Sequence, residues 1–214
     1  MNARALPRML KNALCRTVPV AVLTCLKPYK AHVYAAKNWN KEYASGQWDY
    51  LEQVGEVARY SVMAGYCSFF KGRGAILDIG CGTGVLMRRL REIGYGSYLG
   101  VDLSGEAIRR AKADEDETTR FEVADAATFV PNQDYDAIIF NEILYYLPEP
   151  RGILRRYANH LRPNGIMIVS MHRAANSLRT WRLLKSVAPI RDAVSLTNTT
   201  SRLSWDIKVY ACAG

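Results

Sequence analysis

The stretch "ILDIGCGTG", residues 76–84, constrains the fold of this chain more than any other feature. A short apolar run ends in an acid and opens into three alternating glycines, which is typical of a buried strand followed by a tight turn. Glycine at Gly80, Gly82 and Gly84 removes Cβ atoms that would keep a ligand off the backbone, and it permits turn conformations that other residues rarely adopt. The stretch therefore predicts a strand, a bare turn, and a helix whose first N–H groups face a ligand.

From residue 75 onward, short runs rich in Ile and Val alternate with helical patterns, as in a parallel sheet covered on both faces. The predicted strands span residues 75–78, 98–102, 121–124, 137–140 and 166–170. A predicted helix over 176–187 precedes two β segments, 193–199 and 203–213, whose short connection requires antiparallel pairing. The sequence therefore predicts an α/β fold with a doubly wound, mostly parallel sheet that ends in an antiparallel hairpin.

Local signals mark where the helices begin and end. Gly94 follows the apolar positions of the helix after the glycine turn and predicts its end. Ser104 is expected to cap the next helix, with Glu106 in the first turn, where a negative charge suits the helix dipole. The stretch 147–165 indicates a helix that starts at a proline and ends before a glycine turn.

Acids at the ends of neighbouring strands indicate what the glycine turn binds. Ligands of doubly wound sheets lie beyond the carboxyl ends of the strands, where the strand order reverses. The spacing differs from the dinucleotide pattern G-x-G-x-x-G, because position 85 is Val85. Asp102 ends the second strand, where a carboxylate can bind both hydroxyls of a ribose, and Asp125 ends the third, where it can accept a hydrogen bond from an exocyclic amine. The pattern predicts a nucleotide-like cofactor.

With these motifs the sequence resembles the class I S-adenosylmethionine-dependent methyltransferases of the small-molecule type, from about residue 75 to the C-terminus. The motifs are "LDIGCGTG", "GVDLS", "VADAATF", "YDAIIFNEILYYL" and "LRPNGIMIVS". The resemblance implies a Rossmann-like sheet of seven strands and S-adenosylmethionine as the cofactor, with the glycine turn under its methionine part. The cofactor-binding residues expected from it and from the lid segment are Asp78, Gly80, Cys81, Gly82, Gly84, Asp102, Leu103, Asp125, Ala126, Asn141, Tyr43 and Trp48.

The residues after the fourth strand bear on the acceptor. "NEILYYL" replaces the N-P-P-Y or D-P-P-Y motif that similar enzymes use on the amino groups of nucleic-acid bases. Asn141 and Glu142 should border the methionine end of the cofactor and the acceptor. The catalytic candidates are His172, Glu142 and Tyr146, with His172 or a desolvated Glu142 as the general base. Tyr146, like Tyr145, is expected to form pocket wall rather than to transfer protons, because an unperturbed tyrosine titrates at about 10.

The aromatic segment 38–60 precedes the predicted core and resembles the N-terminal lid of small-molecule methyltransferases. Trp39, Tyr43, Trp48 and Tyr50 would exclude water and stabilise the cationic sulfonium, or they would simply pin a helix onto the sheet. Arg59 could reach the cofactor carboxylate. The predicted division is a basic segment with a helical lid over residues 1–70 and a methyltransferase core over 71–214.

The net charge of +9 is unevenly distributed along the chain. Residues 1–41 contain eight basic residues and no acid, residues 42–150 contain ten basic and eighteen acidic residues, and residues 151–214 contain eleven basic and two acidic residues. Basic flanks suit an anionic acceptor, a lipid-linked saccharide or nucleic acid, although solvated helix faces carry such charge as well.

The cysteines and the N-terminal segment bear on the compartment. Five scattered cysteines without a C-x-x-C pair favour reduced thiols, no metal site and a cytoplasmic location. No stretch reaches the roughly 18–20 apolar residues of a membrane-spanning helix. The basic start of the chain resembles a targeting segment; we favour an amphipathic segment that packs on the domain or lies on a membrane surface.

The predicted function is an S-adenosylmethionine-dependent transferase that methylates an oxygen or nitrogen atom of a small or medium-sized metabolite. The partner is then a small-molecule acceptor and not nucleic acid. The alternative is an RNA or protein methyltransferase whose basic flanks bind phosphates. A third hypothesis is a cofactor-binding protein without catalysis.

Overall fold

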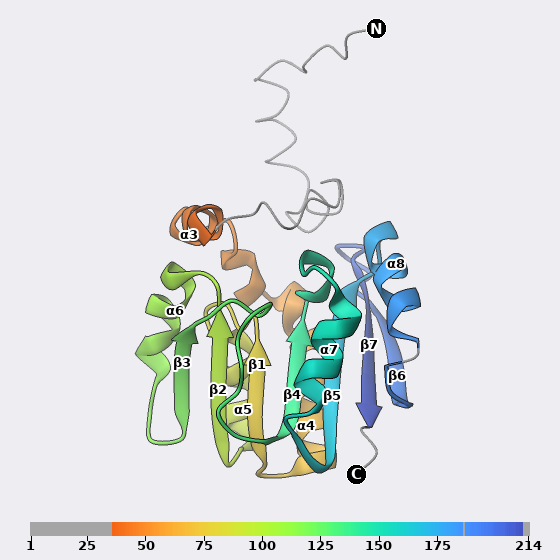
Figure 1. Ribbon diagram of the computed structural model, residues 1–214. Coiled ribbons are helices and arrows are strands. Elements are labelled where there is room, and N and C mark those ends of the chain that lie inside the picture. The colour runs from red at the N-terminus through yellow and green to blue at the C-terminus, as the bar shows by residue number, and fades with distance from the viewer. Residues whose placement is uncertain (1–35, 186, 212–214) are drawn as a thin grey trace, which may run out of the picture.

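The computed structural model describes residues 36–185 and 187–211, and Figure 1 shows a central sheet with helices on both faces. The strands are β1 (Ala75–Ile79), β2 (Ser97–Asp102), β3 (Thr119–Val123), β4 (Tyr135–Asn141), β5 (Leu161–His172), β6 (Ile190–Thr197) and β7 (Ser204–Ala211). Their spatial order is β3-β2-β1-β4-β5-β7-β6, so the order reverses between β1 and β4. This reversal places a crevice at the carboxyl ends of β1, β2 and β4.

The pairing directions confirm the predicted sheet. β3, β2, β1, β4 and β5 are mutually parallel, whereas β7 is antiparallel to both β5 and β6. β5 starts at Leu161, five residues before the predicted start. Leu161 pairs with Tyr135 of β4, and the register between the two strands then shifts before Ile166 pairs with Ala137. Asn164, at a φ of +62°, lies in that irregular part. Local apolar periodicity does not reveal such an extension.

The helices divide between the two faces of the sheet. They are α3 (Ala36–Ala44), α4 (Val54–Lys71), α5 (Val85–Ile93), α6 (Gly105–Ala111), α7 (Pro150–Ala158) and α8 (Ala175–Leu184), with the short 3-10 turns η2 (Asp49–Glu52), η3 (Lys112–Asp114) and η4 (Leu144–Tyr146). α4, α5 and α6 bury their apolar residues in one core cluster, and α7 and α8 bury theirs in a second cluster on the opposite face. The predicted boundary between the lid segment and the core, at residue 70, falls within α4, and α4 packs in the same core cluster as α5 and α6. The division into two functional parts therefore remains a prediction.

Three of the predicted helix limits agree with the structure. Ser104 caps α6, where its hydroxyl oxygen accepts a hydrogen bond of 3.1 Å from the Ala107 N–H. Gly94 ends α5, and Pro150 begins α7. α8 ends at Leu184, three residues before the predicted end.

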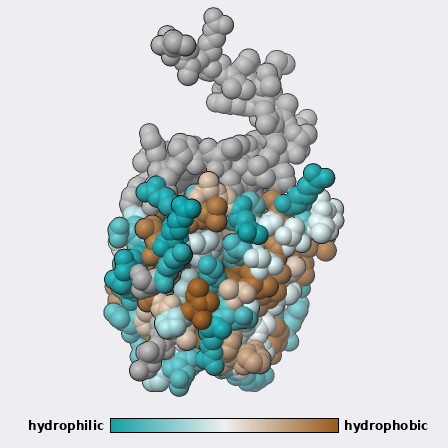
Figure 2. Space-filling view, turned by 90° about the vertical axis from the view of Figure 1, so that its right-hand side faces the viewer, coloured by the Kyte–Doolittle hydropathy of each residue, from teal (hydrophilic) through white to brown (hydrophobic). Residues whose placement is uncertain are grey.

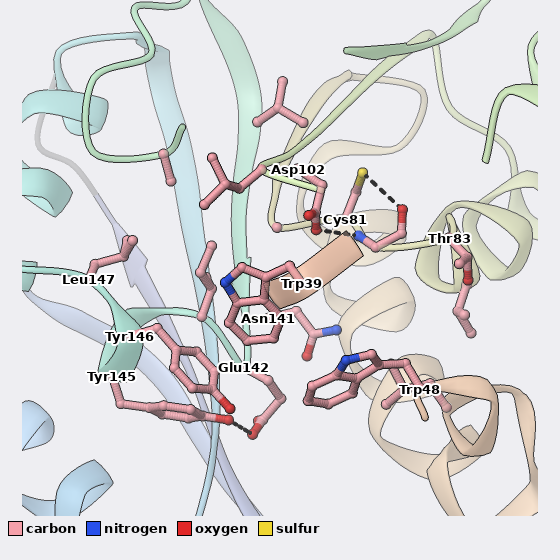
Figure 3. A pocket seen from close by; sticks show the side chains of 18 of the residues that line it. Trp39, Trp48, Cys81, Thr83, Asp102, Asn141, Glu142, Tyr145, Tyr146 and Leu147 are labelled. Atoms are coloured by element: carbon pink, nitrogen blue, oxygen red, sulfur yellow. Dashed lines mark hydrogen bonds between the residues drawn. The ribbon is translucent and has the colours of Figure 1, made fainter. Parts of the chain in front are cut away.

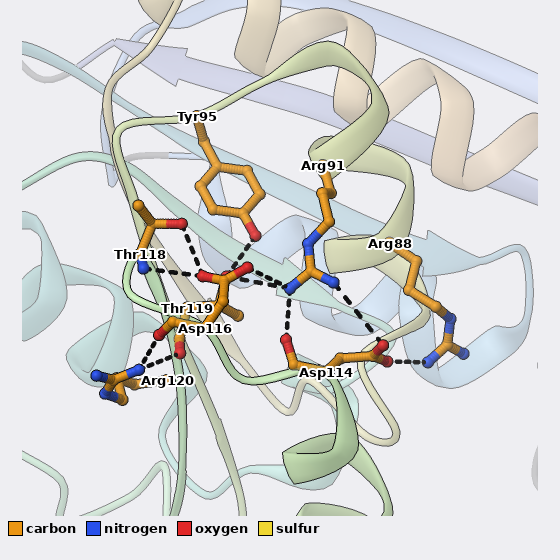
Figure 4. Close-up of polar contacts among 8 residues, drawn as sticks. All are labelled: Arg88, Arg91, Tyr95, Asp114, Asp116, Thr118, Thr119 and Arg120. Atoms are coloured by element: carbon orange, nitrogen blue, oxygen red, sulfur yellow. Dashed lines mark hydrogen bonds and ion pairs between the residues drawn. The ribbon is translucent and has the colours of Figure 1, made fainter.

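A charged network fixes α5 to the chain that leads into β3 (Figure 4). Arg91 donates to Asp116 at 2.9 Å, and Arg88 donates to Asp114 at 3.0 Å. The side chains of this network are partly exposed, so each pair contributes less than about 1 kcal/mol to stability. Together they join α5 to η3 and to the chain just before β3.

The predictions about a targeting or membrane-surface segment concern residues 1–35, which lie outside the described part of the chain. In residues 36–185 and 187–211, no helix combines the length and the apolar character that crossing a membrane requires.

Candidate functional site

A cavity lies at the carboxyl ends of β1, β2 and β4 (Figure 3), the ends above which α3 lies in Figure 1. Its wall comes from the glycine turn, from the ends of β2 and β4, from the loop after β3, and from η4 and the aromatic N-terminal segment. The predicted site residues that line it are Tyr43, Trp48, Gly80, Cys81, Gly82, Asp102, Leu103, Asp125, Ala126, Asn141, Glu142, Tyr146 and His172. The fold thus gathers thirteen predicted residues from separate parts of the chain into one wall.

The glycine turn adopts the backbone conformations that only glycine takes readily. The φ angles are +75° at Gly80, +57° at Gly82 and +80° at Gly84. A Cβ atom at Gly82 would lie 2.8 Å from the hydroxyl oxygen of Tyr43, so the bare backbone also admits the lid segment. At Gly84, a Cβ atom would crowd the ring of Phe121 at 3.1 Å. Gly80 and Gly82 line the cavity, and Gly84 starts α5.

Asp102 joins the glycine turn to the end of β2. One carboxylate oxygen accepts a hydrogen bond from the Gly82 N–H at 2.9 Å, and the other accepts one from the Ser104 N–H at 2.8 Å. Burial raises the pKa of Asp102, and these backbone donors oppose the increase. Asp125, after β3, lines the same cavity, and its carboxylate accepts from the Ala127 N–H at 2.8 Å. Two carboxylates therefore border one side of the crevice.

Asp78 lies behind the turn and not in the described cavity wall. It is 1% exposed, and the Tyr98 hydroxyl donates a hydrogen bond of 2.7 Å to one of its oxygens. Its other oxygen has no hydrogen-bond partner among the described residues. Burial raises the pKa of Asp78 to about 7.

Glu142 connects the ends of two strands with η4. Its carboxylate accepts three hydrogen bonds, from the Tyr145 hydroxyl at 2.8 Å, the Ser170 hydroxyl at 3.0 Å and the His172 N–H at 2.9 Å. Its φ of +61° is unusual for a residue other than glycine, and such strained positions cluster at functional sites. Because three donors already occupy this carboxylate, it is better arranged to hold neighbouring groups than to accept a further proton.

Arg59 is the main residue that the predicted site set omits, although the sequence suggested it for the cofactor carboxylate. It is 1% exposed and donates to Glu56 at 2.7 and 3.2 Å and to the Asn141 side-chain oxygen. Its guanidinium lies 4.5 Å from the ring centre of Tyr60. These contacts fix a buried cation next to the end of β4.

The sequence reasoning also missed several residues of the wall, among them Glu56, Tyr60 and Trp205, whereas Tyr50 was expected in the lid and lines the cavity. Glu56 and Arg59 are three residues apart, a spacing at which opposite charges on a helix form an ion pair, so the sequence alone could have predicted this pair. Trp205 comes from β7, far along the chain, and no local pattern connects it with the glycine turn.

His172 lines the cavity at the end of β5, and its ring lies 6.1 Å from that of Trp205. Burial lowers the pKa of His172, an effect that the nearby Glu142 opposes. The imidazole is therefore mostly uncharged at neutral pH, which a proton acceptor requires.

Aromatic side chains from α3, η4 and the chain before η2 cover the cavity (Figure 3). The ring of Trp39 lies 5.2 Å from Tyr146 and 5.7 Å from Trp48, and Tyr43 lies 6.1 Å from Trp48. The indole N–H of Trp48 is buried and has no hydrogen-bond partner in the described part of the chain. A buried donor of this kind is suited to a ligand acceptor atom.

The comparisons with known proteins agree with this geometry. A family model described as a methyltransferase domain matches residues 50–201. The chain is 30% identical over 136 residues to the 27-O-demethylrifamycin SV methyltransferase of Amycolatopsis mediterranei, an alignment that covers 59% of this chain and 50% of that protein. It is 26% identical over 143 residues to the ubiquinone biosynthesis O-methyltransferase of Neisseria meningitidis, with 64% and 57% covered. The chain spans about half the length of these curated relatives.

Solved structures share the fold. The 1,6-didemethyltoxoflavin-N1-methyltransferase of Burkholderia thailandensis superposes with a TM-score of 0.68 at 16% identity, covering 100% of this chain and 94% of that chain. The N-methyltransferase NodS of Bradyrhizobium japonicum gives a TM-score of 0.65 at 18% identity, covering 77% and 91%. The resemblance predicted from the motifs is thereby confirmed, and the chain belongs to the methyltransferase domain family.

Proposed function

We propose that this chain binds S-adenosylmethionine in the cavity and transfers its methyl group to an oxygen or nitrogen atom of a small or medium-sized metabolite. The observation that carries the proposal is the hydrogen bond between Gly82 and Asp102 at the strand-order reversal. It places side-chain-free backbone and a carboxylate together where ligands of such sheets bind.

The donors and acceptors of the wall fit this cofactor. The Asp102 carboxylate suits the ribose hydroxyls, and Asp125 suits the adenine amino group, with Leu103 and Ala126 as apolar neighbours. At the other end, Arg59 is a buried cation near the end of β4, where a carboxylate can bind. Aromatic faces such as that of Trp48 stabilise a cationic sulfonium.

The chemistry divides between the cofactor and the chain. When bound, the cofactor would supply an electrophilic methyl carbon and a sulfur that takes the electron pair of the broken bond, and the acceptor would supply the lone pair and lose a proton. The chain aligns the acceptor, and the aromatic cover excludes water. We assign His172 the role of proton acceptor and Glu142 that of a positioning residue, since its carboxylate holds Tyr145 and the end of β5. Tyr146 forms part of the wall.

A small acceptor accords better with the described wall than RNA does. Among the described lining residues, Arg59 is the one lysine or arginine, and the proposed cofactor site already uses it. A phosphate backbone requires several such contacts. The basic flanks, taken alone, favour an anionic or lipid-linked acceptor, whereas the charged residues of the described cavity wall are Glu56, Asp102, Asp125 and Glu142 with Arg59.

The proposal is tested at Asp102. We expect Asp102→Ala to weaken binding of S-adenosylmethionine at least tenfold, about 1.4 kcal/mol, because the ribose hydroxyls lose their acceptor. Asp102→Asn removes the charge but keeps a side-chain oxygen that can accept a hydrogen bond. It therefore distinguishes the effect of the lost charge from the effect of a disrupted turn. Asp134→Ala, an exposed acid elsewhere, is the matched control. Calorimetry that shows unchanged affinity for Asp102→Ala would remove the assigned role.

The transfer itself is tested with a radiolabelled methyl group and a cell extract separated into metabolite, lipid, RNA and protein fractions. Label in the metabolite fraction is the expected result. Label confined to RNA or protein contradicts the proposed acceptor class, and cofactor binding without any labelled product contradicts catalysis.

A further inference from the structure

We propose that the outer face of α7 and α8 binds the surface of a membrane that contains anionic lipids. The residues of this docking face are Arg151, Arg155, Leu178, Arg182, Leu183 and Lys185. They do not belong to the described cavity wall, and the binding does not depend on the proposed methyl transfer.

The docking face comes from a stretch of the chain whose charged side chains are all basic. Residues 150–191 contain nine lysines and arginines and no aspartate or glutamate. Glu149 and Asp192 border the stretch, and the Asp192 carboxylate accepts a hydrogen bond of 2.7 Å from the Tyr66 hydroxyl. Ordinary protein surfaces intersperse both signs of charge. A long stretch of one sign therefore indicates an anionic partner.

α7 and α8 turn four of these cations toward solvent. The two helices lie side by side on the face of the sheet opposite α4, and they bury their apolar residues in one core cluster (Figure 1). Arg151 and Arg155 are one turn apart on α7. Arg182 and Lys185 are one turn apart at the end of α8, and all four residues are exposed.

The four cations have no acidic partner. All aspartates and glutamates of the chain lie in the described residues 36–185 and 187–211, and none of them forms an ion pair with these four side chains. The cations are therefore available to the headgroups of an anionic surface.

Two leucines project from the outer side of α8. Leu178 is 51% exposed and precedes Arg182 by one turn, and Leu183 is 45% exposed. Figure 2 looks onto the side of the molecule that carries α8 and β6, where hydrophobic and hydrophilic side chains lie next to one another. Such a mixture suits a membrane surface, where cations meet the lipid headgroups and apolar side chains reach the acyl boundary. An RNA backbone would bind the cations but leave the leucines in water, so the observations favour a membrane.

The size of the expected effect follows from the number of charges. A lysine or arginine near an anionic bilayer surface raises the affinity about fivefold, and salt weakens this attraction. Four such residues together with two leucines give a measurable and reversible association.

The test sediments the full chain with two kinds of vesicle, one of phosphatidylcholine alone and one of phosphatidylcholine and phosphatidylglycerol in equal parts. We expect the chain to bind the anionic vesicles at least tenfold more tightly, and added salt to weaken this binding. The absence of any preference for the anionic vesicles overturns the proposal.

A pair of charge variants locates the binding on α8. Arg182→Gln with Lys185→Gln removes two cations of the docking face, so the affinity for the anionic vesicles should fall at least tenfold. Arg109→Gln with Lys112→Gln removes the same charge at the same spacing from exposed positions of α6 and η3, and it should change the affinity by no more than about twofold. Unchanged affinity in the α8 variant, or equal losses in both variants, overturns the proposal.

A leucine variant distinguishes a bilayer from RNA. Leu178→Ala with Leu183→Ala keeps the helix, because alanine favours helices, and it should lower the affinity for the anionic vesicles at least fivefold. Ile93→Ala, with a side chain of α5 that is 48% exposed, is the control. The affinity for polyadenylate is measured in parallel and should be weaker than that for the vesicles. Tighter binding of polyadenylate, with no effect of the leucine variant on either partner, would identify an RNA-binding face and overturn the proposal.

Discussion

The Asp78 carboxyl group is buried, so its protonation affects the free energy of unfolding. Burial raises its pKa from 3.8 to about 7 in the folded chain. Between these values the folded chain keeps the proton and the unfolded chain loses it, so the free energy of unfolding falls as the pH rises. We expect Asp78→Asn to gain about 2 kcal/mol relative to the unaltered chain between pH 5 and pH 8, measured by urea unfolding. A difference that does not vary with pH would contradict the raised pKa.

The lowered pKa of His172 leads to a prediction about how catalysis depends on pH. Because burial lowers its pKa, the base form prevails down to a pH below the ordinary value of 6.5. We expect kcat/KM to fall on the acid side with an inflection below 6.5, and Asn or Ala at this position to lower kcat and abolish that inflection. Cofactor affinity, measured by calorimetry, should remain unchanged. A variant with the same pH profile would exclude His172 as the proton acceptor.

At the scale of elements, the attachment of α3 to α6 holds the cover over the cavity. The Asn40 side-chain oxygen accepts hydrogen bonds from the Ser104 hydroxyl at 2.8 Å and from the Glu106 N–H at 3.1 Å. Arg110 on α6 adds bonds to the Tyr43 carbonyl oxygen at 3.3 Å and to Asp49 at 2.9 Å. The aromatic cover therefore depends on polar contacts outside the cavity.

We expect Asn40→Ala to loosen this attachment. Two hydrogen bonds contribute about 2 kcal/mol together, so opening of α3 should become roughly thirtyfold more frequent. Limited trypsin digestion followed by mass spectrometry measures cleavage after the exposed Lys41, and the acceptor KM should rise in parallel. Asn132→Ala, in an exposed loop, is the control. Equal cleavage rates in both variants would show that Asn40 does not hold α3.

The molecule as a whole depends on close packing between the sheet and α4, α5 and α6. A Cβ atom at Gly100 in β2 would lie 2.7 Å from the Phe121 ring and 2.9 Å from the Cys81 sulfur, both buried in that core cluster. We expect Gly100→Ala to lower the free energy of unfolding by about 1–3 kcal/mol through overpacking. Gly65→Ala, on the exposed side of α4 with open space around it, should raise it by about 0.5–1 kcal/mol. Urea unfolding of both variants checks the contrast, and equal effects would refute it.

Much of the fold was predictable from the sequence because it depends on neighbours along the chain. Apolar periodicity indicated the order of strands and helices, Ser104 and Gly94 marked helix ends, and the glycines at 80–84 required an unusual turn. Asp102 could be assigned to the same crevice because parallel strands end on one side of a sheet. Local propensity and the direction of the chain determine these features, so they can be predicted from the sequence alone.

The tertiary structure alone decided which distant groups meet and which charges face the cavity. Arg59 reaches Asn141, the Glu142 carboxylate is occupied by donors from β5 and η4, and Trp205 joins the wall from the last strand. The basic flanks suited an anionic acceptor among other partners, yet Arg182 of α8 and Arg191 of β6 are exposed and do not belong to the described cavity wall. Such pairings depend on sheet register and helix packing over many residues, and no pattern among near neighbours in the sequence determines them.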